Sequence, residues 1–241
     1  GKSYNVLEFI TWTKNNLIVH TILSIIPVFL YQILDWKWIA LPWTVVALLG
    51  TATAFIVGFK NTQTYNRTWE ARQIWGAILN NSRGFGIMTR DFLSDSNETK
   101  DLYNRHFAWV TALRYQMREH KPWENIAKKN NIEYQKNYSI PEKEIPMEEV
   151  LKKYLSSEEL YYILTTKNRA TQLLSNQSKA LKKLKDKNVL DTYTFVELEK
   201  LIKELYEQQG RSERIKNFPY PRQFATINAF FIKLFAIMLP F

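Results

Sequence analysis

Few side chains in this sequence are of the types that catalyse reactions or bind metal ions. The 241 residues include three histidines and no cysteine, so no thiolate nucleophile and no cysteine-ligated metal site can form. His106 and His120 lack the i, i+4 spacing of a helical zinc motif, and we interpret them as surface or core residues. The acidic pairs Glu148-Glu149 and Glu158-Glu159 are typical of solvated helix faces. We therefore expect no catalytic residue, no metal site, no cofactor and no enzyme.

A lysine-rich stretch between residues 179 and 187 is the one strongly charged run, and it reads KALKKLKDK. Such a run can bind anionic lipid through the surface potential or nucleic acid through counterion release. It lacks interleaved aromatic residues that would stack on bases, which favours a solvated helix flank and argues against nucleic acid as a partner.

Two residue stripes lie within one apolar segment, and both recur every fourth position. Gly50, Ala54 and Gly58 form a small-residue stripe that would let a neighbouring membrane helix approach closely. Thr51, Phe55 and Phe59 form a second stripe about 100° round the helix. If several copies packed around an axis, this second stripe could form a narrow apolar constriction that gates by dewetting. The alternative is that both phenylalanines face lipid, and periodicity does not decide between the two.

These stripes require a membrane helix to carry them, and the N-terminal region supplies two. Residues 17–34 and 39–59 carry no formal charge when His20 is neutral, and each run is long enough to cross or nearly cross a bilayer. Lys60, Arg67 and Arg72 follow the second run, and Lys2 and Lys14 precede the first, which predicts that both ends are cytosolic. A signal peptide is disfavoured because a second span follows directly. A buried helical hairpin of a soluble protein is the other alternative.

The rest of the chain consists of a polar body and a third apolar segment. Residues 60–220 show helical spacing of bulky side chains and no period-2 strand pattern, so we predict an all-α protein. Within residues 102–119 the expected apolar stripe is Phe107, Val110, Leu113 and Met117, and residues 121–149 are expected to be loop or short helix. A helix is expected over residues 157–185, with its start at residues 156–159. We interpret Arg67, Glu70 and Arg72 as packing contacts between cytosolic helices rather than as pore-lining charges. Residues 224–241 are apolar apart from Lys233, which can snorkel or face protein. The net charge of +10 and the negative mean hydropathy of −0.32 therefore average a basic body with nearly charge-free membrane segments.

The residues after the second span resemble the bestrophin family of ion channels, including its bacterial members. The resemblance rests on Gly58-Phe59-Lys60-Asn61-Thr62, Tyr65-Asn66-Arg67, Trp69-Glu70-Ala71-Arg72 and Trp75-Gly76, and later on Glu213-Arg214, Pro219-Tyr220-Pro221 and Leu239-Pro240-Phe241.

The resemblance implies a homopentamer with one central pore, whose second helix lines a narrow neck with three apolar positions. Those positions fall on Thr51, Phe55 and Phe59, where Thr51 departs from the bulky apolar residue usual in the family. A second constriction, at the cytosolic end of the pore, is expected near Tyr193. The acidic segment of the animal calcium clasp is not present in this sequence, so calcium gating is not inferred.

These observations together predict membrane helices continuous with a large cytosolic helical bundle around a central pore. The expected organisation is an N-terminal part with two transmembrane helices (1–59), a cytosolic domain (60–220) and a third membrane segment (221–241), in a chain truncated before a fourth. The expected function is the passage of small monovalent ions, chloride or other anions by family and cations possible in a bacterial member. Its partners would be other copies of the chain, the lipid bilayer and the permeating ions, in the inner or plasma membrane. The alternative function is a membrane-anchored helical scaffold that binds anionic lipid or nucleic acid.

Overall fold

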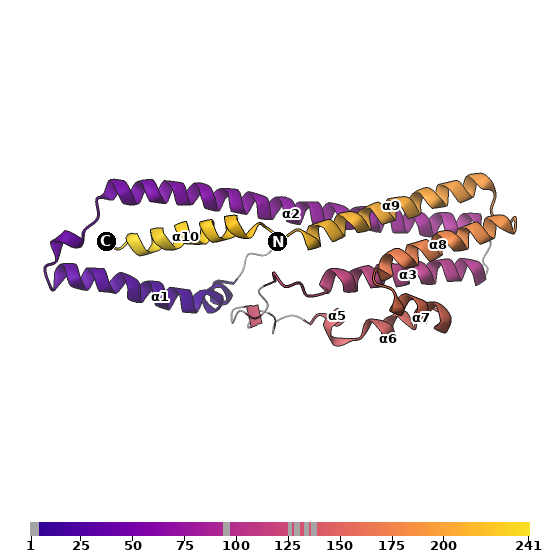
Figure 1. The fold of residues 1–241 in the computed structure, drawn as a ribbon, viewed down its shortest axis with the longest axis horizontal. Helices are drawn as coiled ribbons and strands as arrows, with labels where there is room; N and C mark the ends of the chain where they lie inside the picture. The colour runs from indigo at the N-terminus through magenta and orange to yellow at the C-terminus, as the bar shows by residue number, and fades with distance from the viewer. Residues whose placement is uncertain (1–4, 94–96, 125–126, 128–130, 133–134, 136–138) are drawn as a thin grey trace. The chain divides into compact units, whose positions relative to one another are not determined.

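A computed structural model describes residues 5–93, 97–124, 127, 131–132, 135 and 139–241. Every regular element in these ranges is a helix, which confirms the all-α prediction. The helices are α1 (Val6–Gln32), η1 (Lys37–Ile39), α2 (Trp43–Phe92), α3 (Asn97–Arg118), α5 (Pro141–Glu144), α6 (Met147–Leu151), α7 (Ser157–Thr165), α8 (Arg169–Asp186), α9 (Thr192–Asn217) and α10 (Arg222–Met238), as drawn in Figure 1. Lys2 and part of the loop predicted after residue 121 lie outside the described residues.

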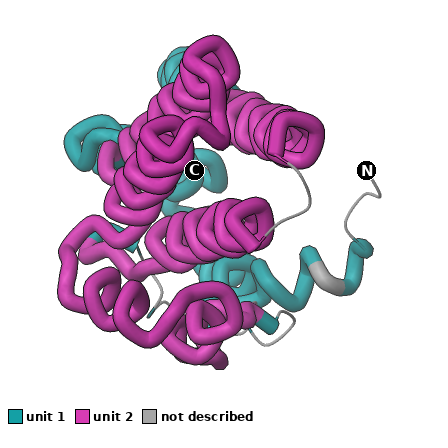
Figure 2. Tube along the Cα trace, turned by 90° about the vertical axis from the view of Figure 1, so that its right-hand side faces the viewer, with its two compact units in different colours: residues 1–66, 123–139, 219–241 teal, residues 67–122, 140–218 magenta. Residues whose placement is uncertain are grey.

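The chain divides into two compact units, and each is formed by segments that are distant in sequence (Figure 2). Unit 1 comprises residues 1–66, 123–139 and 219–241, and unit 2 comprises residues 67–122 and 140–218. The helix α2 contributes to both units, because its first part belongs to unit 1 and its second part to unit 2. The division of the chain at residues 59 and 220 stays a prediction.

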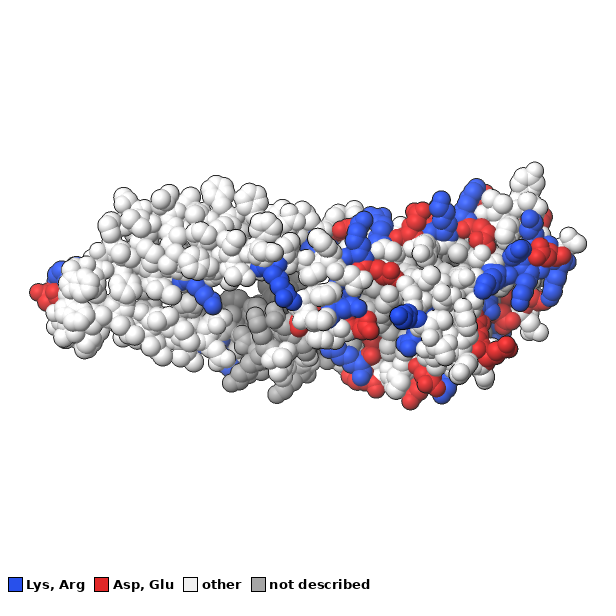
Figure 3. Space-filling view, viewed as in Figure 1, with Lys and Arg blue, Asp and Glu red and all other residues white. Residues whose placement is uncertain are grey.

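Two helices are long and apolar enough to cross a membrane: α1 of unit 1, and α2, whose first part lies in unit 1. The candidate spans lie in Phe9–Gln32 and in the helical stretch Lys37–Phe92, and only 6% and 11% of the residues in their most apolar windows are buried. A core helix of a soluble protein would bury most of such a window. The apolar exposure therefore disfavours the soluble hairpin alternative. Figure 3 shows how charge is distributed between the units: most of the charged side chains visible on that face belong to unit 2.

The turn between α1 and α2 is fixed by a few local contacts. Asp35 adopts a φ of 56°, a left-handed conformation that Asp tolerates better than most residues. The Lys37 ammonium lies 3.0 Å from the Asp35 carboxylate and donates to the Tyr31 carbonyl at 3.1 Å. This short polar turn reverses the chain and places α2 beside the other helices of unit 1 (Figure 1).

The helix α10 completes unit 1 by packing on the other two. A Cβ atom built on Gly50 of α2 would lie 3.0 Å from the Phe235 ring, which shows how closely α10 approaches at this point. The Leu41 N–H donates to the Phe241 carbonyl at 3.0 Å. This hydrogen bond joins the residues just before α2 to the residues just after α10. Buried Asn228 donates to the Tyr220 hydroxyl at 3.2 Å.

Unit 2 is a helical bundle with a continuous aliphatic core. Its fully buried side chains come mainly from α2, α3, α8 and α9, with Leu151 from α6 and Ile163 from α7, and include Ile74, Phe85, Leu102, Trp109, Leu113, Leu173, Leu181, Leu198 and Leu205. On α2, α3, α8 and α9 these residues are 4, 7, 8 or 11 positions apart, which places each set on one helix face. Burial of apolar surface therefore holds the helices of this bundle together.

Two details of the predicted helices were wrong. The stripe expected on α3 included Phe107, but Phe107 is 52% exposed, and the buried stripe runs through Leu102, His106, Trp109 and Leu113. The continuous helix expected over residues 157–185 breaks between α7 and α8, because the side chain of Asn168 caps α8 by accepting from the Thr171 N–H at 3.1 Å. The predicted helix start near residues 156–159 is confirmed, since the Ser156 hydroxyl accepts from the Glu159 N–H at 3.3 Å.

Candidate pore site

The predicted neck residues lie on the exposed side of α2 within unit 1. Phe55 and Phe59 are 66% and 70% exposed, and Thr51 is exposed as well. Val46 and Thr53 are buried, and Gly50 contacts Phe235 of the same chain. At 100° per residue, the buried set and the Thr51, Phe55, Phe59 stripe point to nearly opposite sides of the helix. One chain thus buries one side of this helix and leaves the Thr51, Phe55, Phe59 stripe exposed on the other side.

The hydroxyl group of Thr51 is bound within its own helix. It donates to the Ala47 carbonyl at 3.0 Å, four residues earlier. This pairing occupies the only hydrogen that the side chain could donate elsewhere. Thr51 is therefore a less polar member of the stripe than its residue type suggests, which eases its departure from the bulky apolar residue expected there.

The small residues of α2 differ in what they contact. Gly50 meets Phe235 of α10, whereas Ala54 is exposed and a Cβ atom built on Gly58 would have no neighbour within 4 Å. The close approach expected for this stripe is thus observed inside the chain at Gly50 alone among the three. Helix packing between copies through Ala54 and Gly58 stays a prediction.

Tyr193 lies in unit 2, in the first turn of α9, and its side chain is 87% exposed. The Asp191 carboxylate caps this helix by accepting from the N–H groups of Tyr193 at 2.7 Å and Thr194 at 3.0 Å. Hydrogen bonds from the Thr194 side chain and backbone lower the pKa of Asp191. The cap therefore fixes the backbone from which Tyr193 projects into solvent.

The charged residues that follow the second apolar run bind other helices of unit 2. Arg67 donates to the carbonyls of Phe218 at 2.6 Å and Ile215 at 3.0 Å, which satisfies carbonyl groups at the C-terminal end of α9. Glu70 forms an ion pair with Arg214 at 2.8 Å. These contacts agree with the structural role that the sequence favoured for such charges over lining a pore.

Glu213, the acidic residue of the later motif, accepts three hydrogen bonds on one carboxylate oxygen. The donors are Gln116 of α3 at 3.0 Å, Asn168 at 3.4 Å and Gln209 of α9 at 2.9 Å. Buried Gln209 in turn accepts from the Trp109 indole N–H at 2.9 Å. This polar cluster joins α3, α8 and α9. Sequence periodicity could not find it, because its members come from separate helices.

His106 is buried in the core of unit 2 between aromatic rings. Its imidazole is 5.3 Å from the Phe85 ring and 5.4 Å from the Trp109 ring, and within the described part of the chain its Nε2 atom has no hydrogen-bond partner. Burial lowers the pKa of His106 from 6.5 to about 4. It is thus a core histidine, as expected, but one held in its neutral form by apolar surroundings.

This burial predicts a loss of stability in acid. The pKa of His106 is near 6.5 when unfolded and about 4 when folded, so the unfolded chain binds more protons between these values and stability falls as pH drops through that window. We expect His106→Phe to remove about 2 to 3 kcal/mol of the change between pH 7 and pH 4.5. Thermal and denaturant unfolding of the purified protein would measure it, with exposed His120→Gln as the control. Equal pH dependence in His106→Phe and the parent would contradict the assignment.

No group of three or more His, Asp or Glu side chains within the described ranges is placed to hold a metal ion. The structure instead resembles a known class of membrane protein. A model of the bacterial and fungal bestrophin family matches residues 8–241. The chain belongs to the bestrophin family.

Known bestrophin relatives show how far the similarity extends. The voltage-dependent anion channel-forming protein YneE of Escherichia coli is 26% identical over 231 residues, which cover 95% of this chain and 67% of that protein. The voltage-dependent anion channel-forming protein RSc3414 of Ralstonia nicotianae is 38% identical over 90 residues, 35% of this chain and 28% of that protein. The chain thus spans about two thirds of the length of YneE.

A solved bestrophin structure has the same fold. The crystal structure of a bacterial bestrophin homologue from Klebsiella pneumoniae superposes with a TM-score of 0.78 at 23% identity, over 93% of this chain and 75% of that chain. The fold prediction is confirmed by this match. The expectation of a membrane ion channel, and not an enzyme, is confirmed at the level of the bestrophin family.

Proposed function

We propose that this bestrophin assembles as a homopentamer around a central pore that passes small monovalent anions, chloride among them. The observation that carries the proposal is the exposed Thr51, Phe55, Phe59 stripe, on the side of α2 opposite the face that the chain itself buries. Copies of α2 around one axis would bring these stripes together. Two aromatic rings per subunit would then leave a narrow, apolar neck that is unfavourable for water and ions to cross.

The membrane arrangement of the proposal follows from hydropathy and charge. Residues 1–59 would supply two spans, residues 221–241 a third membrane segment, and residues 60–220 the cytosolic body in the inner or plasma membrane of a bacterium. The lysine and arginine residues that follow the second apolar run support this orientation. Tyr193 would line an aperture at the cytosolic end of the pore.

The proposed anion preference rests on two observations. The bacterial relatives are named as anion channel-forming proteins, and this chain carries ten more basic than acidic residues. An excess of basic groups beside a pore raises the local concentration of anions by focusing the electrostatic field.

Reversal potentials test the sign of the permeating ion. We expect that the purified protein in a planar bilayer, with a tenfold KCl gradient, gives a reversal potential close to the chloride equilibrium potential. Native mass spectrometry of the same sample should give five chains per particle. A reversal potential at the potassium value would overturn anion selectivity, and a monomer without ion flux would favour the scaffold alternative.

A further inference from the structure

Unit 2 contains a groove that the proposed pore does not use. It lies between α3, α7 and α8, has a volume of about 490 Å³ and is lined by fourteen residues, four of them basic and four acidic. A volume of this size is ordinary for sites that bind small molecules.

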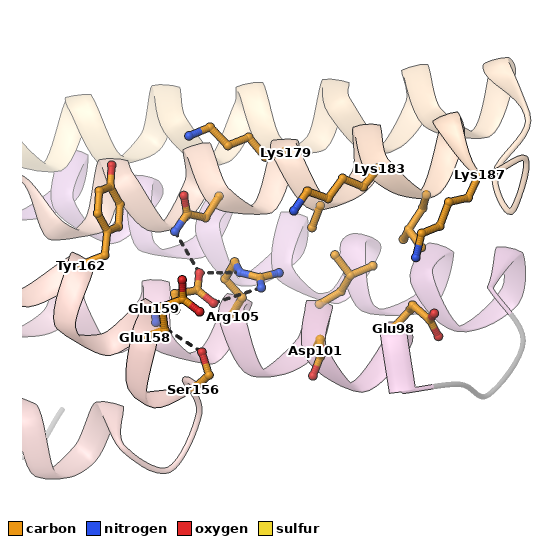
Figure 4. A pocket seen from close by; sticks show the side chains of 14 residues that line it. Glu98, Asp101, Arg105, Ser156, Glu158, Glu159, Tyr162, Lys179, Lys183 and Lys187 are labelled. Atoms are coloured by element: carbon orange, nitrogen blue, oxygen red, sulfur yellow. Dashed lines mark hydrogen bonds and ion pairs between the residues drawn. The ribbon is translucent and has the colours of Figure 1, made fainter.

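The charges of the groove are separated onto opposing walls (Figure 4). Lys179 and Lys183 lie on α8 and Lys187 is its C-cap residue, so the three form a row of lysines spaced by about 6 Å, roughly one helical turn. Glu98 and Asp101 lie on the facing helix α3, and Glu158 lies on α7. Buried aliphatic side chains of Leu102 and Leu184 lie in the lining as well.

The opposing charges do not neutralise one another by direct contact. Among the described residues, none of these three lysines and three acids forms an ion pair within 4.0 Å or a side-chain hydrogen bond. By contrast, Arg105 and Glu159 in the same groove form a two-point ion pair, at 2.8 and 3.0 Å. The groove thus has one internally satisfied pair and two facing sets of unpaired charge.

The Arg105–Glu159 pair gives this groove a defined frame. Asn176 of α8 also donates to Glu159 at 3.0 Å, so α3, α7 and α8 are all joined at this point. Both side chains of the pair are only 16% exposed. The positions of the two walls are therefore fixed by the folded bundle and do not depend on mobile surface contacts.

We propose that this groove binds a small dipolar molecule, with a carboxylate at one end, an ammonium group at the other and a short apolar linker, as in ω-amino acids and short peptides. The carboxylate would bind the lysine row, the ammonium group would bind the Glu98 and Asp101 side, and the linker would cover the aliphatic lining. A ligand with only negative charge gains from one wall and is repelled by the other. The same argument applies with reversed sign to a ligand with only positive charge.

Three six-carbon probes separate these cases on the full-length protein in detergent. We expect 6-aminohexanoate to bind saturably, and about tenfold more tightly than adipate or 1,6-diaminohexane, in ligand-observed NMR titrations at low salt. Removing one charge from either wall, by Lys183→Gln or Asp101→Asn, should weaken 6-aminohexanoate about fivefold, the loss of one moderately screened ion pair. Lys182→Gln is the matched control, since Lys182 lies on the same helix but does not line the groove.

The outcomes decide the proposal without reference to ion conduction. Equal or tighter binding of adipate would overturn the dipolar ligand in favour of an anion site on the lysine row. Absence of saturable binding of 6-aminohexanoate, or an affinity that Lys183→Gln and Asp101→Asn leave unchanged, would overturn the site itself. Because this experiment measures binding, a negative result would not contradict the proposed pore. Likewise, absence of ion flux would not contradict the proposed ligand site.

Discussion

Replacing both Phe55 and Phe59 with alanine should raise the single-channel conductance of the reconstituted protein by about tenfold. These rings are the largest side chains of the exposed stripe on α2, so in the proposed pentamer they would close the neck. Alanine removes most of the apolar side chain, widens the neck and lets water remain in it. A tenfold rise corresponds to a barrier lower by about 1.4 kcal/mol. Single-channel recording in planar bilayers measures this change directly.

The matched control for this experiment is Phe230→Ala on α10. Phe230 is also an exposed phenylalanine of unit 1, 59% exposed, but it lies on another helix. Its replacement removes the same ring and should leave the conductance unchanged. Equal currents in the Phe55→Ala, Phe59→Ala double variant and the parent would remove the stripe from the pore and leave its rings as lipid-facing residues.

Glu159→Ala should destabilise unit 2 by about 2 to 3 kcal/mol. The change leaves the Arg105 guanidinium, only 16% exposed, without its two-point partner, and removes the acceptor that Asn176 also uses. Breaking a buried ion pair from one side costs about 3 to 5 kcal/mol, and partial exposure of this pair lowers the expected value. Chemical denaturation of the purified protein, followed by circular dichroism, gives the free energy.

A double variant separates two quantities: the net contribution of the Arg105–Glu159 pair to the free energy of unfolding, and the loss caused by leaving one charge without a partner. Arg105→Met with Glu159→Leu removes both charges and keeps much of the packed volume, so it should be more stable than Glu159→Ala alone. The exposed pair Lys200–Glu197 is the comparison, because Glu197→Ala should change stability by less than about 1 kcal/mol. A double variant as unstable as the single one would show that packing, and not charge, sets the loss.

Local patterns predicted much of this protein, because each one acts over a few residues. The charge-free runs indicated the helices of unit 1, the four-residue spacing singled out Thr51, Phe55 and Phe59, and Ser156 marked the start of α7. Each of these signals repeats with the helical period or caps a helix end. The same logic failed on α3, where the predicted apolar stripe ran through Phe107 but the buried stripe runs through His106.

Contacts between distant segments were beyond such patterns. Glu159 was interpreted as a solvated helix residue, but its partner Arg105 lies 54 positions away. The three donors to Glu213 lie on α3, at the start of α8 and on α9. The lysine run of α8 was interpreted as a solvated flank, although Lys179, Lys183 and Lys187 line a groove against acidic residues of α3.

The sequence by itself therefore determined the helical class and the two N-terminal apolar helices, since these depend on hydrophobicity and spacing along one helix. The bestrophin resemblance came from the residue motifs after the second apolar run and near the end of the chain. The tertiary structure alone decided which face of each helix is covered. It placed Gly50 against Phe235 and left Phe55 and Phe59 exposed on the other side of α2. It also paired Arg105 with Glu159 and left three lysines unpaired opposite three acids. Long-range pairing depends on how helices pack, and no local period encodes that packing.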